Sequence, residues 1–150
     1  MGLKEKLQAD LTEAIRGRDE VKSGTIRMLL SAITNEEVAG KTAKILTDAE
    51  IITVLSRETK KRREAVEAFT AAKRDDLADK EKAEGVIIAQ YLPEQLSEAE
   101  IKKMIADAIT ETNAAGSAGM GLVMKVLQPK IVGKADGGVV SALVKAALGQ

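Results

Sequence analysis

Apolar residues recur every three or four positions along most of this chain, and that spacing restricts what the chain can fold into. Leu3, Leu7, Leu11 and Ile15 stand four residues apart with charged residues between them, which is the pattern of an amphipathic helix. No stretch of useful length alternates apolar and polar residues as a half-buried strand does. The 150 residues include one Phe, one Tyr, no Trp and two Pro, so aliphatic side chains must build the core. The sequence predicts an all-α protein.

Capping residues predict where the helices of the first part begin. Gly17 ends the first helix, and Asp19 can cap a second over about 20–38. Thr47 and Glu50 form a capping-box pattern at the start of the longest helix, about 48–73. A fourth helix begins at the acidic pair 75–76 and runs toward residue 92.

Pro93 marks the boundary that divides the chain into predicted domains 1–92 and 93–150. Ser97 and Glu100 form a second capping box, which opens a fifth helix. A sixth helix is expected over about 120–128, ended or kinked by Pro129. Asp136 can cap a seventh.

The residue inventory excludes most catalytic chemistry. The chain has no His and no Cys, so His-based triads, thiolate nucleophiles, disulfides and the commonest metal ligands are missing. Neither a Gly-x-Ser-x-Gly motif nor a phosphate-binding Gly-x-x-x-x-Gly-Lys-Ser/Thr loop occurs. The neighbouring acids Glu36–Glu37 and Asp75–Asp76 point apart on a helix, which predicts cap or surface positions and no carboxylate dyad. We therefore expect no catalytic residue, no cofactor and no metal.

Location is predicted from the absence of sorting signals. No apolar run reaches about 18 residues, so no membrane span is expected. The first residues are charged and amphipathic, without the apolar core of a signal peptide. A soluble cytoplasmic protein is the expectation.

Charge is balanced over the whole chain and uneven within its last third. The 23 basic residues equal the 23 acidic residues in number. Residues 93–112 carry a net charge of −3, whereas 113–150 carry +3, from four lysines against Asp136 alone. This basic segment indicates an anionic partner.

A second basic stretch lies in the middle of the longest helix. Five cations fall within 57–63, and on a helix they can form a positive stripe that grips phosphates. The alternative is a solvated helix face held by Glu58–Arg62 and Lys60–Glu64 pairs. The candidates for RNA contact in this run are Arg57, Lys60, Lys61 and Arg63.

The loop from Gly133 to Gly137 also has two interpretations. Lys134 stands just before a helix whose first backbone N–H groups can bind an anion. Asp136 can already cap those donors, which would make the loop a plain joint between helices.

Phe69 and Tyr91, the only aromatic residues, lie on apolar helix faces and are expected in the core. RNA binding would therefore rest on backbone and shape contacts.

Several motifs resemble one known family, the YqeY family. Three parts of the last thirty or so residues are similar to motifs of that family: Met120-Gly121-Leu122-Val123-Met124, Gly133-Lys134-Ala135-Asp136 and the final aliphatic helix. Lys61-Arg62-Arg63-Glu64-Ala65 and Tyr91-Leu92-Pro93-Glu94-Gln95-Leu96 match it as well, so the resemblance covers essentially the whole chain. It implies a four-helix N-terminal domain followed by a three-helix C-terminal domain of the GatB/YqeY type, as in the tail of the B subunit of tRNA-dependent amidotransferase.

The resemblance implies function through that tail, which lies beside tRNA while other domains perform catalysis. By resemblance, Lys125, Lys130 and Lys134 are the candidates for RNA contact. The first hypothesis is a non-catalytic protein that binds tRNA or associates with an amidotransferase or another translation-related protein. The second is a participant in carbon–nitrogen ligation with glutamine as amido donor, and the third is a helical protein–protein adaptor.

Overall fold

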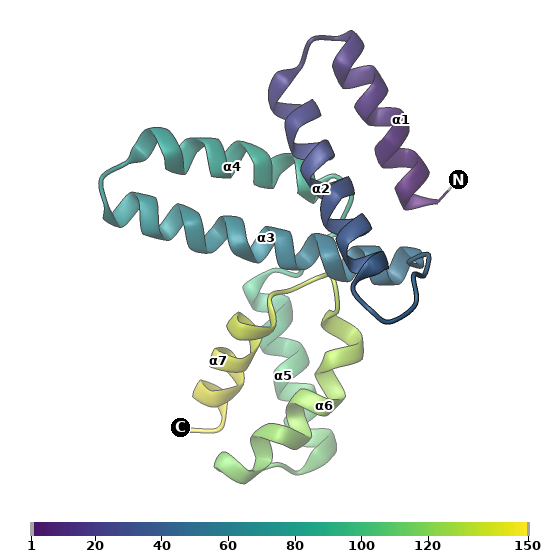
Figure 1. Ribbon diagram of the computed structural model, residues 1–150. Helices are drawn as coiled ribbons and strands as arrows, with labels where there is room; N and C mark the ends of the chain where they lie inside the picture. Colours follow the sequence, from purple (N-terminus) through teal and green to yellow (C-terminus); the bar gives the residue numbers. More distant parts are fainter. Residues whose placement is uncertain (1, 150) are drawn as a thin grey trace. The chain divides into compact units, whose positions relative to one another are not determined.

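The computed structural model describes residues 2–149 and confirms the all-α class, because these residues form helices and no strand (Figure 1). The chain divides into two compact units, Met1–Leu92 and Pro93–Gln150, called here the N-terminal and the C-terminal unit. The N-terminal unit contains α1 (Leu3–Arg16), α2 (Glu20–Val38), α3 (Asp48–Ala71) and α4 (Asp75–Ala89). The C-terminal unit contains α5 (Glu98–Thr112), the short 3-10 helix η1 (Ser117–Gly119), α6 (Met120–Ile131) and α7 (Gly137–Ala147).

The predicted capping residues begin four of these helices. The Asp19 carboxylate accepts from the Lys22 N–H at 3.0 Å, and the Asp136 carboxylate accepts from the Val139 N–H at 2.9 Å. Thr47 and Ser97 each open a complete capping box. Each cap satisfies a backbone donor that the first helical turn leaves unpaired.

Helix ends agree less well with the expectations. The sixth helix was expected to end or kink near Pro129, but α6 continues through it to Ile131. Proline removes one helical hydrogen bond, at a cost of about 3 kcal/mol within a helix. Ile131, one turn beyond Leu127, is buried in the core of the unit, and burial of an isoleucine recovers about 1.5–3 kcal/mol. Packing thus offsets the local preference.

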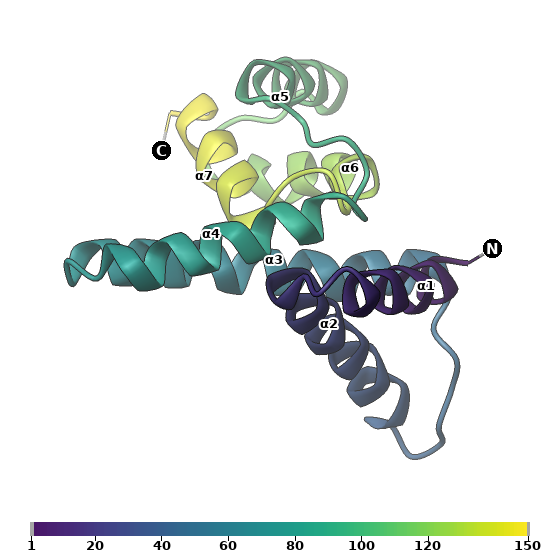
Figure 2. The ribbon, with the colours of Figure 1, turned by 90° about the horizontal axis from the view of Figure 1, so that it is seen from above.

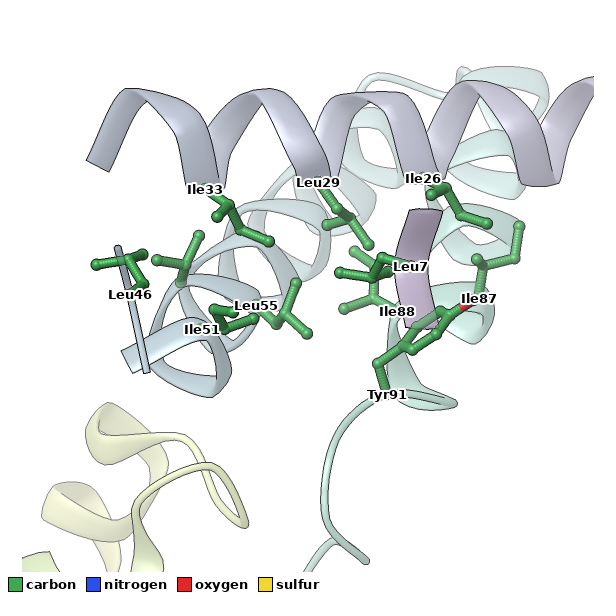
Figure 3. Packing of buried hydrophobic residues seen from close by; sticks show 11 residues of the cluster. Leu7, Ile26, Leu29, Ile33, Leu46, Ile51, Leu55, Ile87, Ile88 and Tyr91 are labelled. Atoms are coloured by element: carbon green, nitrogen blue, oxygen red, sulfur yellow. The ribbon is translucent and has the colours of Figure 1, made fainter. Parts of the chain in front are cut away.

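The N-terminal unit is built around the α3–α4 pair. These two helices run side by side along their length in both views, and their connecting turn lies well away from α1 and α2 (Figures 1 and 2). The core forms where all four helices meet, at the other end of the pair (Figure 3). Tyr91 is buried there, and its hydroxyl donates to Asp10 at 2.6 Å, whereas Phe69 is only half-buried. The large side chains that are fully buried in this core are Leu7, Ile26, Leu29, Ile33, Ile51, Leu55 and Ile88.

The C-terminal unit has its own core. One apolar stripe from each of α5, α6 and α7 faces inward, at the helical spacing that the sequence shows. The buried members are Ile101, Ile105, Ala108, Val123, Leu127, Ile131, Val140 and Val144.

A buried ionic cluster joins α3 to α4. The Arg62 guanidinium lies 3.0 Å from the Glu58 carboxylate and 3.3 Å from the Glu84 carboxylate, and a further guanidinium nitrogen contacts the Met28 sulfur on α2. Both Arg62 and Glu58 are buried. The sequence predicted a Glu58–Arg62 pair on a solvated helix face. The pair is present, but both of its residues are buried and not exposed to solvent. Lys61 extends the cluster to the surface, with its ammonium 3.1 Å from Glu58.

Glu37 forms a second buried ionic contact, although a cap or surface position was expected for it. Its carboxylate lies 2.6 Å from the Lys4 ammonium on α1 and accepts from the Leu46 N–H at 3.1 Å. These contacts connect α1, the end of α2 and the loop before α3. Two hydrogen bonds hold the pKa of Glu37 below its ordinary value of 4.5, because both stabilise the charged carboxylate. The bond from the Lys4 ammonium has the larger effect and the bond from the Leu46 N–H the smaller.

This lowered pKa predicts how stability depends on pH. Because the folded-state pKa is below the unfolded one, the contribution of Glu37 is complete above about pH 4.5 and is lost as the pH falls through the folded value. We expect Glu37→Gln to lower the melting temperature at pH 7, and the difference from wild type to shrink below pH 4.5. Thermal melts from pH 7 to pH 3 measure this. Glu13→Gln, at an exposed pair with Arg16, is the control, and an equal pH dependence in both variants would contradict the assignment.

Candidate nucleic-acid interface

The lysines of α6 and of the loop that follows it are exposed. Lys125, Lys130 and Lys134 are all exposed, and within residues 2–149 none of them forms an ion pair. In α5 of the same unit, Lys102 lies 2.9 Å from Glu98 and Lys103 lies 3.7 Å from Asp107. The unit therefore neutralises the lysines of α5 internally and leaves those of α6 and the loop available to an anion.

The three lysines do not all share one helix face. At about 100° per residue, Lys125 and Lys130 are separated by about 140° around the α6 axis. Lys125 lies opposite the buried stripe of Val123, Leu127 and Ile131, whereas Lys130 lies at its edge. Lys134 follows the helix in the loop. The arrangement presents positive charge around the exposed part of α6 and its C-terminal end.

The Gly133–Gly137 loop is held by backbone contacts. Gly133 has a φ of 75°, which favours glycine, and its carbonyl accepts from the Gln95 side-chain amide at 2.8 Å. The Lys134 carbonyl accepts from the Leu96 N–H at 2.9 Å. Asp136 caps α7, as described above. These bonds support the interpretation of the loop as a joint, which holds the backbone of Lys134 while its side chain stays exposed.

The basic run on α3 is largely committed to carboxylates. The Arg57 guanidinium lies 3.2 Å from Glu36 on α2, and Lys61 pairs with Glu58. Lys60 is exposed, Arg63 is half-buried and Arg62 belongs to the buried cluster. The structure thus distributes these cations among different environments and does not gather them into one stripe.

A pocket of about 310 Å³ lies between α2 and α3. Its walls carry both ion pairs just described, Arg57–Glu36 and Lys61–Glu58, so opposite charges balance inside it. It is lined by Ala32, Asn35, Glu36, Ala39, Val54, Arg57, Glu58 and Lys61. The sequence reasoning missed this pocket, since only tertiary packing brings Glu36 to Arg57.

The signal for the buried cluster was present in the sequence. Ile51, Leu55, Glu58 and Arg62 follow the spacing of a core-facing stripe. Charged residues at two such positions indicate a buried pair, although the partner on α4 cannot be read from that spacing.

The described part of the chain offers neither a metal-binding cluster nor a membrane-spanning helix. Residues 2–149 contain no group of three or more acidic side chains placed to hold a metal ion. None of the helices formed by these residues is both long enough and apolar enough to cross a bilayer. The described surface is thus that of a helical protein with an exposed cationic region in its C-terminal unit.

Comparison with known proteins identifies the class to which this fold and surface belong. The family model described as Yqey-like protein matches residues 4–148, nearly the whole chain. The chain belongs to the YqeY family.

Relatives include fungal proteins with a mitochondrial name. The chain is 34% identical over 133 residues to "Altered inheritance of mitochondria protein 41, mitochondrial" of Pyrenophora tritici-repentis, covering 87% of this chain and 71% of the relative. It is 38% identical over 86 residues to the protein of the same name from Saccharomyces cerevisiae, covering 57% and 46%. An uncharacterized protein of Schizosaccharomyces pombe is 35% identical over 92 residues, covering 61% and 72%. The match spans about half the length of the Saccharomyces cerevisiae relative.

These names correct the expectation about location. A cytoplasmic protein was predicted, but the relatives are named as mitochondrial proteins, which contradicts that prediction. The prediction rested on the absence of a signal peptide and a membrane span. Such absences do not distinguish one aqueous compartment from another.

Proposed function

We propose that this protein is a non-catalytic accessory protein that binds tRNA through its C-terminal unit. The observation that carries the proposal is the set of exposed lysines at 125, 130 and 134, none of which has an ionic partner within residues 2–149. Exposed lysines bind phosphates by releasing counterions from the nucleic acid, and this contributes most of the sequence-independent affinity. The family resemblance to the amidotransferase tail, which lies beside tRNA, supports tRNA as the ligand.

The N-terminal unit has a different role in this proposal. We propose that the chain comprises a four-helix and a three-helix domain, which fold as separate units. The N-terminal domain would then contact a protein partner, such as an amidotransferase or another translation-related protein.

The paired cations of the N-terminal domain, Arg57 and Lys61, make a smaller contribution to RNA binding than the lysines of α6, because an anion must compete with Glu36 and Glu58 for them.

Purified protein and tRNA test the proposal directly. We expect binding at low salt that weakens as salt rises, and a several-fold loss of affinity for Lys134→Glu. Lys103→Glu is the matched control, because it makes the same change in net charge at a lysine that is already paired on α5. Filter binding or fluorescence anisotropy gives the dissociation constants. Absence of measurable tRNA binding at low salt would refute the proposal.

A parallel assay separates binding from catalysis. If the protein is accessory, purified protein shows no glutaminase and no transamidation activity, alone or with amidotransferase subunits. The lack of His and Cys in the sequence motivates this expectation. Activity that disappears on mutation of this chain would favour the alternative, direct participation in carbon–nitrogen ligation.

A further inference from the structure

The side of α6 that faces away from the core is exposed along its length. Gly121, Leu122, Lys125, Gln128 and Pro129 share this side, called here the outer α6 face, and all five are exposed. Leu122 keeps 52% of its surface accessible. The face carries positive charge, and the whole segment 113–135 contains no acidic residue. An anionic ligand is therefore the complement to this face.

Two features distinguish among anionic ligands. Residues 93–150 contain no aromatic residue, so the C-terminal unit cannot stack the bases of a single strand, which is how proteins usually hold unpaired RNA. The face also presents an amide, Gln128, one turn from Lys125. An amide both donates and accepts hydrogen bonds, as the ribose 2′-hydroxyl does.

We propose that the outer α6 face binds the minor groove of double-helical RNA, with Lys125 contacting phosphate and Gln128 contacting ribose 2′-hydroxyls. The minor groove of an RNA helix is wide and shallow and displays its 2′-hydroxyls, so a helix face can approach it without entering a deep groove. Leu122 packs against ribose carbons. Gly121 has no side chain to hold the RNA backbone away. The inference rests on the proposed function and deepens it, because it names the form of RNA that is recognised.

Two glycines can be replaced by alanine without a steric clash, which provides a test variant and its control. A methyl group added at Gly121 meets no atom within 4 Å, and the same holds for Gly85 in α4 of the N-terminal unit. Alanine favours a helix over glycine, so both Gly121→Ala and Gly85→Ala are expected to melt at or above the wild-type temperature. Only the change at Gly121 places a methyl group on the outer α6 face.

The experiment compares three probes with equal numbers of phosphates: a duplex RNA, a duplex DNA of the same sequence and a single-stranded oligouridine. We expect wild type to bind the duplex RNA most tightly, by about 3–10-fold, which corresponds to one or two net hydrogen bonds. Gln128→Ala is expected to reduce the preference for RNA over DNA. Gly121→Ala is expected to weaken duplex-RNA binding while Gly85→Ala leaves it unchanged.

The outcomes separate this inference from the proposed function. If wild type binds none of the three probes and no tRNA, the proposed function fails. If it binds tRNA but holds the oligouridine as tightly as the duplex RNA, or if Gln128→Ala leaves the ratio of RNA to DNA affinity unchanged, only the minor-groove inference is overturned.

Discussion

Arg62→Ala is expected to destabilise the N-terminal unit by about 3–5 kcal/mol, the usual cost of removing one partner from a buried ion pair. The variant leaves Glu58 and Glu84 near one another without the guanidinium that lies between them. Lys61 still pairs with Glu58 from the surface, but Glu84 has no other ion-pair partner among the described residues. For a unit of this size, the loss lowers the melting temperature by at least about 12 °C. Calorimetry measures both the temperature and the number of transitions.

An apolar replacement of the whole cluster is the control. Glu58→Met, Arg62→Leu and Glu84→Met together remove all three charges of the cluster and keep most of the volume. Such replacements are commonly neutral or stabilising, so this variant is expected to be at least as stable as wild type. A loss below about 1 kcal/mol for Arg62→Ala would show that the cluster is well solvated.

The same variant tests the proposed division into two domains. If the units fold separately, Arg62→Ala lowers one calorimetric transition and leaves that of the C-terminal unit in place. A single transition that moves as a whole would contradict the division.

Reversing the charge of Lys125, Lys130 and Lys134 together is expected to weaken tRNA binding by roughly 100-fold at low salt. All three are exposed and form no ion pair with another described residue, so no such pair has to break when they bind phosphate. If each makes one phosphate contact, wild-type affinity falls by about 40-fold between about 50 and 200 mM salt. The triple variant should lose most of this salt dependence. Titrations at several salt concentrations measure the slope.

A second triple variant provides the comparison. Arg57→Glu, Lys60→Glu and Lys61→Glu change the net charge by the same amount on α3, where two of the three cations are already paired. We expect a clearly smaller loss of affinity, provided that circular dichroism shows the helices intact. An equal loss in both variants would indicate that overall charge, and not the α6 region, determines binding.

The helical fold was predictable because the local signals agree with the packing. Asp19, Thr47, Ser97 and Asp136 all cap helices where the sequence placed them, since a cap depends on residues within one turn. Helix ends depend on what the last turn buries. For that reason α6 passes Pro129 and reaches Ile131, which no local rule indicates.

The candidate site was less predictable, because charge in a sequence does not reveal pairing. Lys61 and Lys125 look alike as exposed helical lysines, yet one pairs with Glu58 and the other has no ionic partner among the described residues. Glu37 pairs with Lys4, which is 33 residues away in the chain, and Arg62 reaches Glu84 on another helix. Such contacts follow from tertiary packing. The sequence shows where basic residues cluster, but not which of them already have an ionic partner in the folded protein.

Crosslinking of RNA to the protein in living cells, followed by sequencing of the bound RNA and mapping of the crosslinked peptides, tests the central proposal most directly. The proposal predicts that tRNA is enriched and that crosslinks fall within 120–137, the segment that carries Lys125, Lys130 and Lys134. Recovery of no tRNA above background, or crosslinks confined to 57–63 on α3, would contradict it.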